Sequence, residues 1–272
     1  MHNRSYYNDL LIKKQKNKGV DAEYFWDSRA ENYSKMQNKQ REGMPPKVIE
    51  HLIRNKLIDK KTKVLDIGGG SGRYAIPLAQ VADRVVLTDI SAKMLEYAEA
   101  NAKKEGLDNL EYVKLDLDKA NIREMGWNEK FDLVFASMCP AIRNEQALDK
   151  MMEASKGSCY IGQYIAMTDN IIEAIMGELD LSRRDDPHND RDSVYAIFNI
   201  LWLKGYEPEI SYIREETEEE IAFEELKKMY GDKYAPIAKE RNKDLDKIFL
   251  SLEDHLILKR KRTLALIWWK VR

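Results

Sequence analysis

Short apolar runs alternate with amphipathic segments along most of this 272-residue chain. The runs are rich in Val, Ile, Leu and Phe, and the segments between them repeat apolar residues at helical spacing. The runs predict strands at residues 63–67, 84–89, 110–114, 131–136, 158–164, 207–213 and 263–271. The intervening segments predict helices at residues 72–81, 92–104, 144–154, 168–181 and 193–204. Such alternation is typical of an α/β protein with a mainly parallel sheet.

The two ends of this pattern differ from its middle. Before the first strand only helices are predicted, including one capped by Asp21 with Trp26, Ala30 and Tyr33 on one face. After residue 213 an acidic stretch leads into an apolar stripe typical of a helix. We therefore predict four parts, namely a helical cap at 1–58, a core at 59–213, a helical insertion at 214–258 and a last strand at 259–272.

The first predicted strand runs into a turn with four glycines within five positions. Glycine allows φ > 0 and lets a ligand approach the backbone closely. Read from Gly70, the turn fits G-x-G-x-x-[GA], and Asp89 falls where a ribose-binding acid would lie, so an NAD-linked oxidoreductase is one alternative. Asp66, at the end of the strand, would repel a pyrophosphate and attract a cationic ligand. The glycines are Gly68, Gly69, Gly70 and Gly72.

The same residues carry a family resemblance. Val-Leu-Asp-Ile-Gly-Gly-Gly-Ser-Gly at 64–72 resembles motif I, D/E-x-G-x-G-x-G, of the class I S-adenosylmethionine-dependent methyltransferases. The strand that ends in Asp89 and Ile90 resembles their second motif. The resemblance implies a Rossmann-like, doubly wound, seven-stranded and mostly parallel sheet with an antiparallel last strand. It also implies S-adenosyl-L-methionine as cofactor, with the insertion placed to act as a lid.

Particular roles follow from the resemblance. Asp66 and the glycine turn are expected at the methionine end of the cofactor, and Asp89 at both ribose hydroxyls. Met94, Asp116 and Leu117 are expected near the adenine, although Asp118 is close enough to be confused with Asp116. The end of the fourth strand, at Ser137 and Met138, is expected to border the methyl group, and Tyr33 to fold over the cofactor.

No residue pattern identifies a catalytic base. His188 lies in a charged loop, Tyr33 in the N-terminal stripe and Cys139 beside the expected methyl position, so these three are candidates. A solvated loop histidine and a small apolar cysteine are the more common interpretations of such residues. His51 is expected on the solvent side of its helix and Trp127 in an exposed loop. No metal-ligand pattern is present.

Composition and charge narrow the class of protein. Apolar residues make up 43% and charged residues 34%, with a net charge of −2, so no global positive field favours nucleic acid. Two cysteines do not make a disulfide framework, and we expect a cytoplasmic protein without signal peptide or membrane span. The basic run 259–262 is typical of a solvated turn. Oligomeric state is left open.

These observations predict a methyltransferase that acts on a small-molecule acceptor. The segment 137–142 lacks the N/D-P-P-Y/F pattern of amino-methylating nucleic-acid enzymes, which lowers the weight of that class. The alternatives are an RNA or protein methyltransferase, an NAD-linked oxidoreductase, and a non-catalytic module that binds S-adenosylmethionine.

Overall fold

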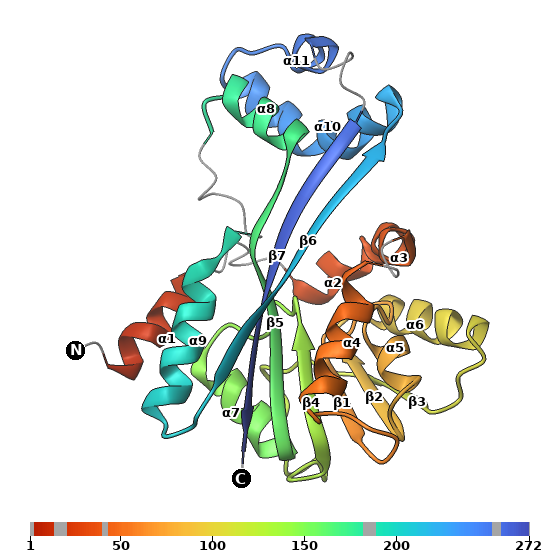
Figure 1. Cartoon of the computed structure of the whole chain (residues 1–272), viewed down its shortest axis with the longest axis vertical. Coiled ribbons are helices and arrows are strands. Elements are labelled where there is room, and N and C mark those ends of the chain that lie inside the picture. The colour runs from red at the N-terminus through yellow and green to blue at the C-terminus, as the bar shows by residue number, and fades with distance from the viewer. Residues whose placement is uncertain (1–2, 14–20, 40–42, 182–188, 252–256, 272) are drawn as a thin grey trace. The chain divides into compact units, whose positions relative to one another are not determined.

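The computed structural model describes residues 3–13, 21–39, 43–181, 189–251 and 257–271. The chain forms two compact units (Figure 1). Unit 1 comprises Met1–Gln163, Asp192–Ile213 and Ala265–Arg272, and unit 2 comprises Tyr164–Arg191 and Arg214–Leu264. The chain passes from one unit into the other within three of its strands, β5, β6 and β7.

The strands form one seven-stranded sheet in the order β3-β2-β1-β4-β5-β7-β6. Strands β1 to β5 pair in parallel, and β7 runs antiparallel to its neighbours (Figure 1). This confirms the predicted doubly wound α/β fold. The strands are β1 (Lys63–Ile67), β2 (Arg84–Asp89), β3 (Leu110–Lys114), β4 (Phe131–Ser137), β5 (Ser155–Asp169), β6 (Glu209–Glu220) and β7 (Ile257–Lys270).

The helices of unit 1 flank this sheet. Helices α5 and α6 pack against β2, α7 packs against β4, and α2 and α3 pack on α6 (Figure 1). They are α1 (Arg4–Lys13), α2 (Ala22–Asp27), α3 (Ala30–Lys39), α4 (Met44–Arg54), α5 (Ala75–Ala79), α6 (Ala92–Lys104), α7 (Glu145–Ala154) and α9 (Arg191–Leu203). Helix α6 has the predicted bounds, and Ser91 caps it by accepting a hydrogen bond from the Met94 amide at 3.1 Å.

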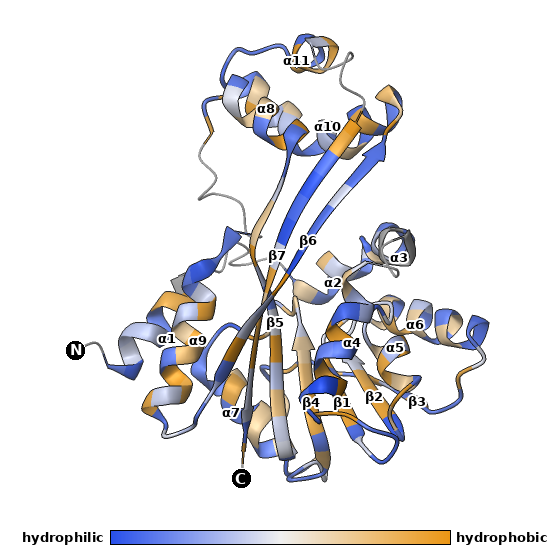
Figure 2. Ribbon diagram, in the orientation of Figure 1, coloured by the Kyte–Doolittle hydropathy of each residue, from blue (hydrophilic) through white to orange (hydrophobic). Residues whose placement is uncertain are grey.

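The core of unit 1 lies around β1 and β4. Their apolar side chains are buried, as expected for central parallel strands. The ribbons of both strands are largely in the hydrophobic colour (Figure 2). The Phe135 and Tyr160 rings, on paired positions of β4 and β5, stack with centroids 5.2 Å apart. The apolar runs in the sequence therefore mark the centre of the sheet correctly.

Three local expectations were wrong. The helix predicted from Asp21 is two helices, α2 and α3, separated by a turn at Ser28 and Arg29. His51 is 7% exposed, with its ring 4.7 Å from that of Trp268, because α4 turns this face toward the sheet. Trp127 is 6% exposed and packs edge-on against Phe131 at 5.6 Å. The ring that packs on His51 is distant in sequence, whereas the ring that packs on Trp127 belongs to the strand that follows it.

The boundaries around the predicted insertion also differ. Strand β6 continues through the acidic stretch to Glu220, so residues 214–220 are strand and not helical insertion. Strand β7 starts at Ile257, so the basic run lies in a strand and not in a solvated turn. The two charged stretches face each other as ion pairs: Glu215 with Arg262, Glu216 with Lys261, Glu218 with Lys259 and Glu219 with Arg260. Cross-strand pairing of opposite charges stabilises this ladder.

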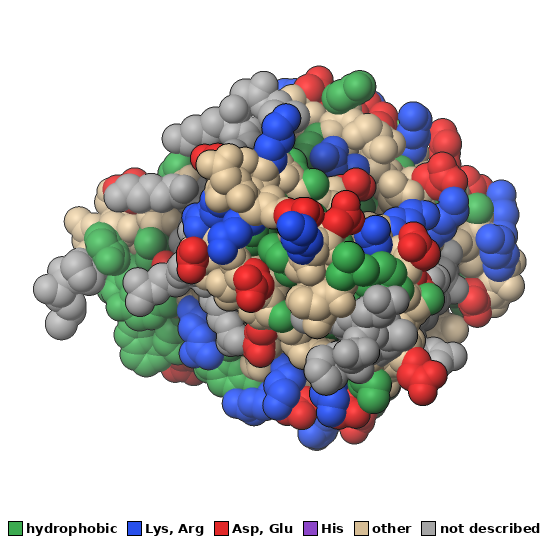
Figure 3. All heavy atoms as spheres, turned by 90° about the horizontal axis from the view of Figure 1, so that it is seen from above, with side chains coloured by type: hydrophobic (Ala, Val, Ile, Leu, Met, Phe, Trp, Pro, Cys, Tyr) green, Lys and Arg blue, Asp and Glu red, His purple; other side chains and the backbone are tan. Residues whose placement is uncertain are grey.

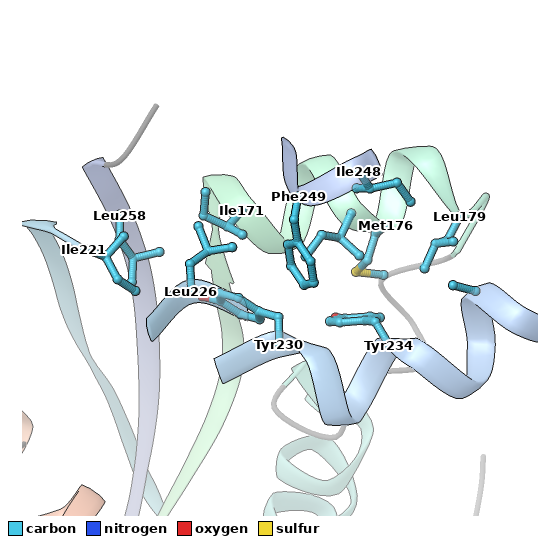
Figure 4. Close-up of a cluster of buried hydrophobic side chains, with 12 residues drawn as sticks. Ile171, Met176, Leu179, Ile221, Leu226, Tyr230, Tyr234, Ile248, Phe249 and Leu258 are labelled. Atoms are coloured by element: carbon cyan, nitrogen blue, oxygen red, sulfur yellow. The ribbon is translucent and has the colours of Figure 1, made fainter. Parts of the chain in front are cut away.

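Unit 2 has its own hydrophobic cluster (Figure 4). Its helices are α8 (Asn170–Glu178), α10 (Phe223–Glu240) and α11 (Leu245–Ser251). The predicted stripe contributes Ile248 and Phe249, which meet Ile171 and Tyr230 in this cluster. Asp169 caps α8 at the Ile172 amide and accepts a hydrogen bond from the Tyr230 hydroxyl at 2.7 Å. A lid function for the insertion stays a prediction.

Candidate functional site at the carboxyl ends of the parallel strands

Four neighbouring strands bring their carboxyl ends to one edge of the sheet. In the order β3-β2-β1-β4 they are all parallel, and the chain order reverses between β1 and β4. Ligands of open α/β sheets bind outside such a switch point. Asp66, Asp89 and Ser137 lie in the last two residues of β1, β2 and β4.

The turn after β1 requires glycine for two different reasons. Gly68, Gly70 and Gly72 have φ of +68°, +57° and +90°, in the left-handed region that other residues rarely adopt. Gly69 is limited by space, because a Cβ there would lie 2.6 Å from Asp66 Oδ2 and 2.8 Å from Leu87 Cγ. The turn therefore packs directly on its own strand and on β2.

Strand β2 holds the turn through its backbone and its terminal carboxylate. The Gly69 amide donates to the Thr88 carbonyl at 3.0 Å. The Gly70 amide donates to Asp89 Oδ2 at 3.0 Å, and the Ser91 amide donates to Asp89 Oδ1 at 2.9 Å. The amides of Gly69 and Gly70, which a dinucleotide pyrophosphate could use, are thus already hydrogen-bonded within the chain. Each Asp89 oxygen can still accept a further hydrogen bond from a hydroxyl. Burial raises the pKa of Asp89, and the amide hydrogen bonds oppose that rise.

Asp66 is the most unusual polar group of this edge. It is 1% exposed, and its Oδ2 has no hydrogen-bond partner among the described residues. Burial, followed by the charge of Asp89, raises its pKa to about 8. From the sequence this carboxyl was expected to be a negative charge, but with a pKa of about 8 it is mainly protonated at neutral pH in the ligand-free chain.

The residues expected near the adenine lie beside this turn. Met94 and Leu117 are buried, and Ile90 is half-buried. Asp116 accepts from the Asp118 amide at 3.2 Å and pairs with Lys119 at 2.9 Å. Asp118 differs from Asp116 because its carboxylate forms an ion pair with Arg143. The structure thus separates two carboxylates that the sequence left confused.

The end of β4 supplies an unpaired hydroxyl and a strained residue. Ser137 Oγ is buried without a hydrogen-bond partner in the described parts of the chain. Met138 has φ +54°, which is uncommon for a residue with a side chain. Cys139 packs on Gly68, and its Sγ occupies the space that a Cβ on Gly68 would need. Burial raises the pKa of the Cys139 thiol to about 12. A protonated, buried thiol is a packing group and a poor nucleophile.

The N-terminal helices attach to the same region through α6. Ser91 Oγ donates to Asp27 Oδ1 at 2.5 Å, and the Lys114 ammonium pairs with Glu23 at 2.5 Å. The Tyr33 ring lies edge-on to that of Trp26 at 5.2 Å. Burial raises the pKa of Tyr33, against the charges of Arg29 and Arg73, so its phenol is uncharged. Tyr33 therefore lies within electrostatic range of the glycine turn.

Sequence reasoning missed three residues of this edge. Asp27 ends α2 and reaches the start of α6; the capping pattern around Ser91 gave no sign of it. Arg73 follows the last glycine, and two of its guanidinium nitrogens are buried without a partner in the described ranges. Tyr160 has a similarly unpartnered hydroxyl, and burial raises its pKa well above the usual value. His188, the remaining catalytic candidate, lies outside the described residues.

The described residues offer neither a metal site nor a membrane-spanning helix. No group of three or more His, Cys, Asp or Glu side chains there could hold a metal ion. None of the helices in the same ranges is long and apolar enough to cross a membrane.

Comparison with known proteins adds a family match. A family model described as "Methyltransferase domain" matches residues 58–206, which is more than half of the chain. A 23S rRNA (uracil(1939)-C(5))-methyltransferase of Aeromonas salmonicida is 42% identical over 76 residues, 28% of this chain and 17% of that protein. A tRNA 5-carboxymethoxyuridine methyltransferase of Escherichia coli is 40% identical over 55 residues, 20% of this chain and 21% of that protein. The chain thus spans only about a fifth of the length of these curated relatives.

Solved structures share the fold at low sequence identity. A putative methyltransferase from Bacillus halodurans has a TM-score of 0.55 at 16% identity, over 82% of this chain and 97% of the other. A putative S-adenosyl-L-methionine-dependent methyltransferase from Methanococcus maripaludis has a TM-score of 0.52 at 20% identity, over 71% and 92%.

Proposed function

The chain belongs to the methyltransferase domain family, as a class I S-adenosylmethionine-dependent methyltransferase, and we propose that it methylates a small-molecule acceptor. One observation carries the site assignment. The Oδ2 atom of Asp66 is buried with no hydrogen-bond partner among the described residues, beneath Gly69, where a Cβ would have no room. A buried carboxyl of this kind gains most from a cationic ligand, and the methionine end of S-adenosylmethionine is cationic.

The residues present fit this cofactor. Asp66 would hold the ammonium end, Asp89 would accept hydrogen bonds from the ribose hydroxyls, and Asp116 would accept from the adenine amine. Met94 and Leu117 supply buried apolar surface beside Asp89, and the buried Ser137 and half-buried Met138 end the strand that would border the reacting group. The bound cofactor supplies a methyl group on a sulfonium leaving group. The chain's own task is then alignment and exclusion of water, which needs no strong base.

Two observations favour a small acceptor over RNA. The basic run 259–262, the densest in the sequence, is paired with Glu215, Glu216, Glu218 and Glu219 and is not a free cationic patch. On the face drawn in Figure 3, the described basic and acidic side chains are interspersed. RNA binding draws much of its affinity from unpaired Lys and Arg.

RNA is nevertheless the second candidate acceptor. The curated relatives with the matches given above act on 23S rRNA and on tRNA. Those matches cover 28% and 20% of this chain, so most of the chain lies outside the matched segments.

Cofactor binding and acceptor class are tested separately. Calorimetry with S-adenosylhomocysteine should give saturable binding to the wild type and none to Asp89→Ala, with Asp83→Ala at the start of β2 as control. Unchanged affinity in Asp89→Ala would overturn the site.

The acceptor class is tested by incubating the purified protein with methyl-labelled cofactor and fractionated cell extract, which should place the label in small molecules. Label in RNA would contradict the small-molecule proposal and identify RNA as the acceptor.

We also propose a cytoplasmic location. Cys139 and Cys159 are both free thiols, which agrees with a reducing compartment.

A further inference from the structure

Arg73 is a charged residue of the site that neither sequence motif explains. It follows Gly72 directly and is half-buried. Its Nε and Nη2 atoms are buried and have no hydrogen-bond partner within the described residues. A guanidinium is always charged and can only donate, so burying its N–H groups without an acceptor is costly. Within the described residues, these two donors are therefore available to a bound acceptor.

The immediate neighbours of Arg73 are aromatic rings. Its Cζ lies 5.5 Å from the centroid of the Tyr74 ring, which packs against Phe135 at 5.4 Å. The charge of Arg73 also acts on Tyr33. The charge that shifts the pKa of Asp66 is that of Asp89 and not that of Arg73. Asp66, before the glycine turn, and Arg73, after it, therefore do not form an ion pair. The ring of Tyr74 thus lies within cation–π range of the guanidinium and carries no negative charge that would neutralise it.

The two unpartnered nitrogens define the shape of the missing acceptor. Nε and Nη2 share one edge of the planar guanidinium, and two parallel N–H groups along that edge match the two oxygens of a carboxylate. We propose that Arg73 is the carboxylate-binding residue of this site, and that Asp66 and Arg73 together select a ligand carrying both an ammonium and a carboxylate group. Lysine could not replace it fully, since an ammonium lacks the planar fork.

Two ligands could bring this carboxylate. One is the amino-acid end of the cofactor, in which case the inference rests on the proposed function. The other is an acidic acceptor bound beside the cofactor. In both cases a carboxylate would bind the Arg73 guanidinium. The two cases differ in whether the cofactor or the acceptor must be present for this contact to form.

Calorimetry with two ligands separates them. Wild type, Arg73→Gln and Arg73→Lys are titrated with S-adenosylhomocysteine and with its decarboxylated analogue. A cofactor carboxylate on Arg73 predicts a roughly 10- to 100-fold preference of the wild type for the complete ligand. Arg73→Gln should bind both ligands alike, and Arg73→Lys should retain part of the preference. Arg29→Gln is the matched control, because Arg29 also acts on Tyr33 but donates to the Phe25 carbonyl at 3.2 Å.

The NMR signal of the Arg73 Nε–H group, assigned with the Arg73→Lys variant, reports the contact in the wild-type protein. A downfield shift with the complete ligand, absent with the decarboxylated one, supports the cofactor as source. A shift that appears only when glutarate is added to the complex with the decarboxylated ligand supports an acidic acceptor. No shift under either condition, together with equal affinities in wild type and Arg73→Gln, overturns the proposal. If S-adenosylhomocysteine does not bind the wild type, the proposed function fails, and glutarate added to the ligand-free protein still decides the role of Arg73.

Discussion

Asp66 lies directly beneath Gly69, so closely that a Cβ on Gly69 would come within 2.6 Å of Asp66 Oδ2. The φ of Gly69 is not in the left-handed region, unlike that of its glycine neighbours. Gly69 is therefore needed for space alone. A side chain there would displace either the carboxyl or Leu87, which lies 2.8 Å from the same point.

Gly69→Ala should destabilise the protein by about 1–3 kcal/mol, the usual cost of an overpacked core. It should also weaken binding of S-adenosylhomocysteine, because the displaced carboxyl is the group proposed to hold the ligand's ammonium. Chemical denaturation and calorimetry measure the two effects. Gly177→Ala in α8 is the matched control, since a Cβ there meets nothing within 4 Å and should leave the protein as stable or about 1 kcal/mol more stable. Equal effects of the two substitutions would contradict this account of Gly69.

Binding of the cofactor product should release a proton near pH 7. The pKa of Asp66 is about 8 in the ligand-free chain, so the carboxyl is mainly protonated there, and the ligand's ammonium favours the ionised form. Calorimetry in buffers of different ionisation enthalpy should show release of up to about one proton per site at pH 7. The release should disappear above pH 9 and in Asp66→Asn. Proton uptake in the wild type would refute the assignment.

The same group makes the ligand-free protein less stable as pH rises. Its folded pKa lies above the ordinary value of 3.8, so its contribution is complete below pH 3.8 and is lost as pH rises through about 8. The Asn side chain of Asp66→Asn cannot ionise. The free energy of unfolding of the wild type should therefore fall relative to that of Asp66→Asn as the buffer becomes alkaline. A difference independent of pH between 4 and 9 would mean that Asp66 is ionised throughout.

Asp116 and Asp118 should have different effects on ligand affinity. Asp118 is held by Arg143, whereas Asp116 is part-buried beside Leu117 and forms an ion pair with Lys119 of its own turn. Asp116→Ala should lower affinity for S-adenosylhomocysteine about 10-fold, as expected for a lost hydrogen bond to a carboxylate. Asp118→Ala should stay within about two-fold of wild type. S-inosylhomocysteine, which lacks the adenine amine, should bind wild type and Asp116→Ala alike, and a persistent difference would exclude the amine contact.

His51 should make the protein less stable in mild acid. Its Nε2 lies 2.9 Å from Ser211 Oγ, and burial, followed by the charge of Arg54, lowers its pKa below 6.5. The unfolded chain therefore takes up the proton first, and this contribution to the free energy of unfolding is lost as pH falls below about 6.5. Urea denaturation from pH 5 to 8 should show this loss in the wild type and in His188→Gln but not in His51→Gln. An equal acid response of all three proteins would remove His51 as its cause.

Much of the site could be predicted because it is local. Residues 64–72 contain a strand, a carboxyl and a glycine turn in direct succession, and Asp89 ends the next apolar run. These features depend on the backbone preferences of residues that are close together in the sequence, so the sequence pattern predicts them directly. The same holds for Ser91 and helix α6, whose bounds agree with the capping pattern.

The errors have a common physical cause. His51 is buried against Trp268, which is far away in the sequence, so the pattern around His51 carries no sign of its burial. Glu215 and Arg262 are typical of solvent-exposed segments when each is read alone, but their side chains are 4% and 9% exposed because β6 and β7 pair them. Opposite charges 47 residues apart stabilise a strand only when the strands meet.

The sequence by itself therefore determined the family, the succession of strands and helices in the core, and the position of the glycine turn. Only the tertiary structure decided the protonation of Asp66, the packing role of Cys139 and the unsatisfied donors of Arg73. Protonation and hydrogen-bond satisfaction depend on burial and on neighbours brought together by folding, and neither quantity exists in the unfolded chain.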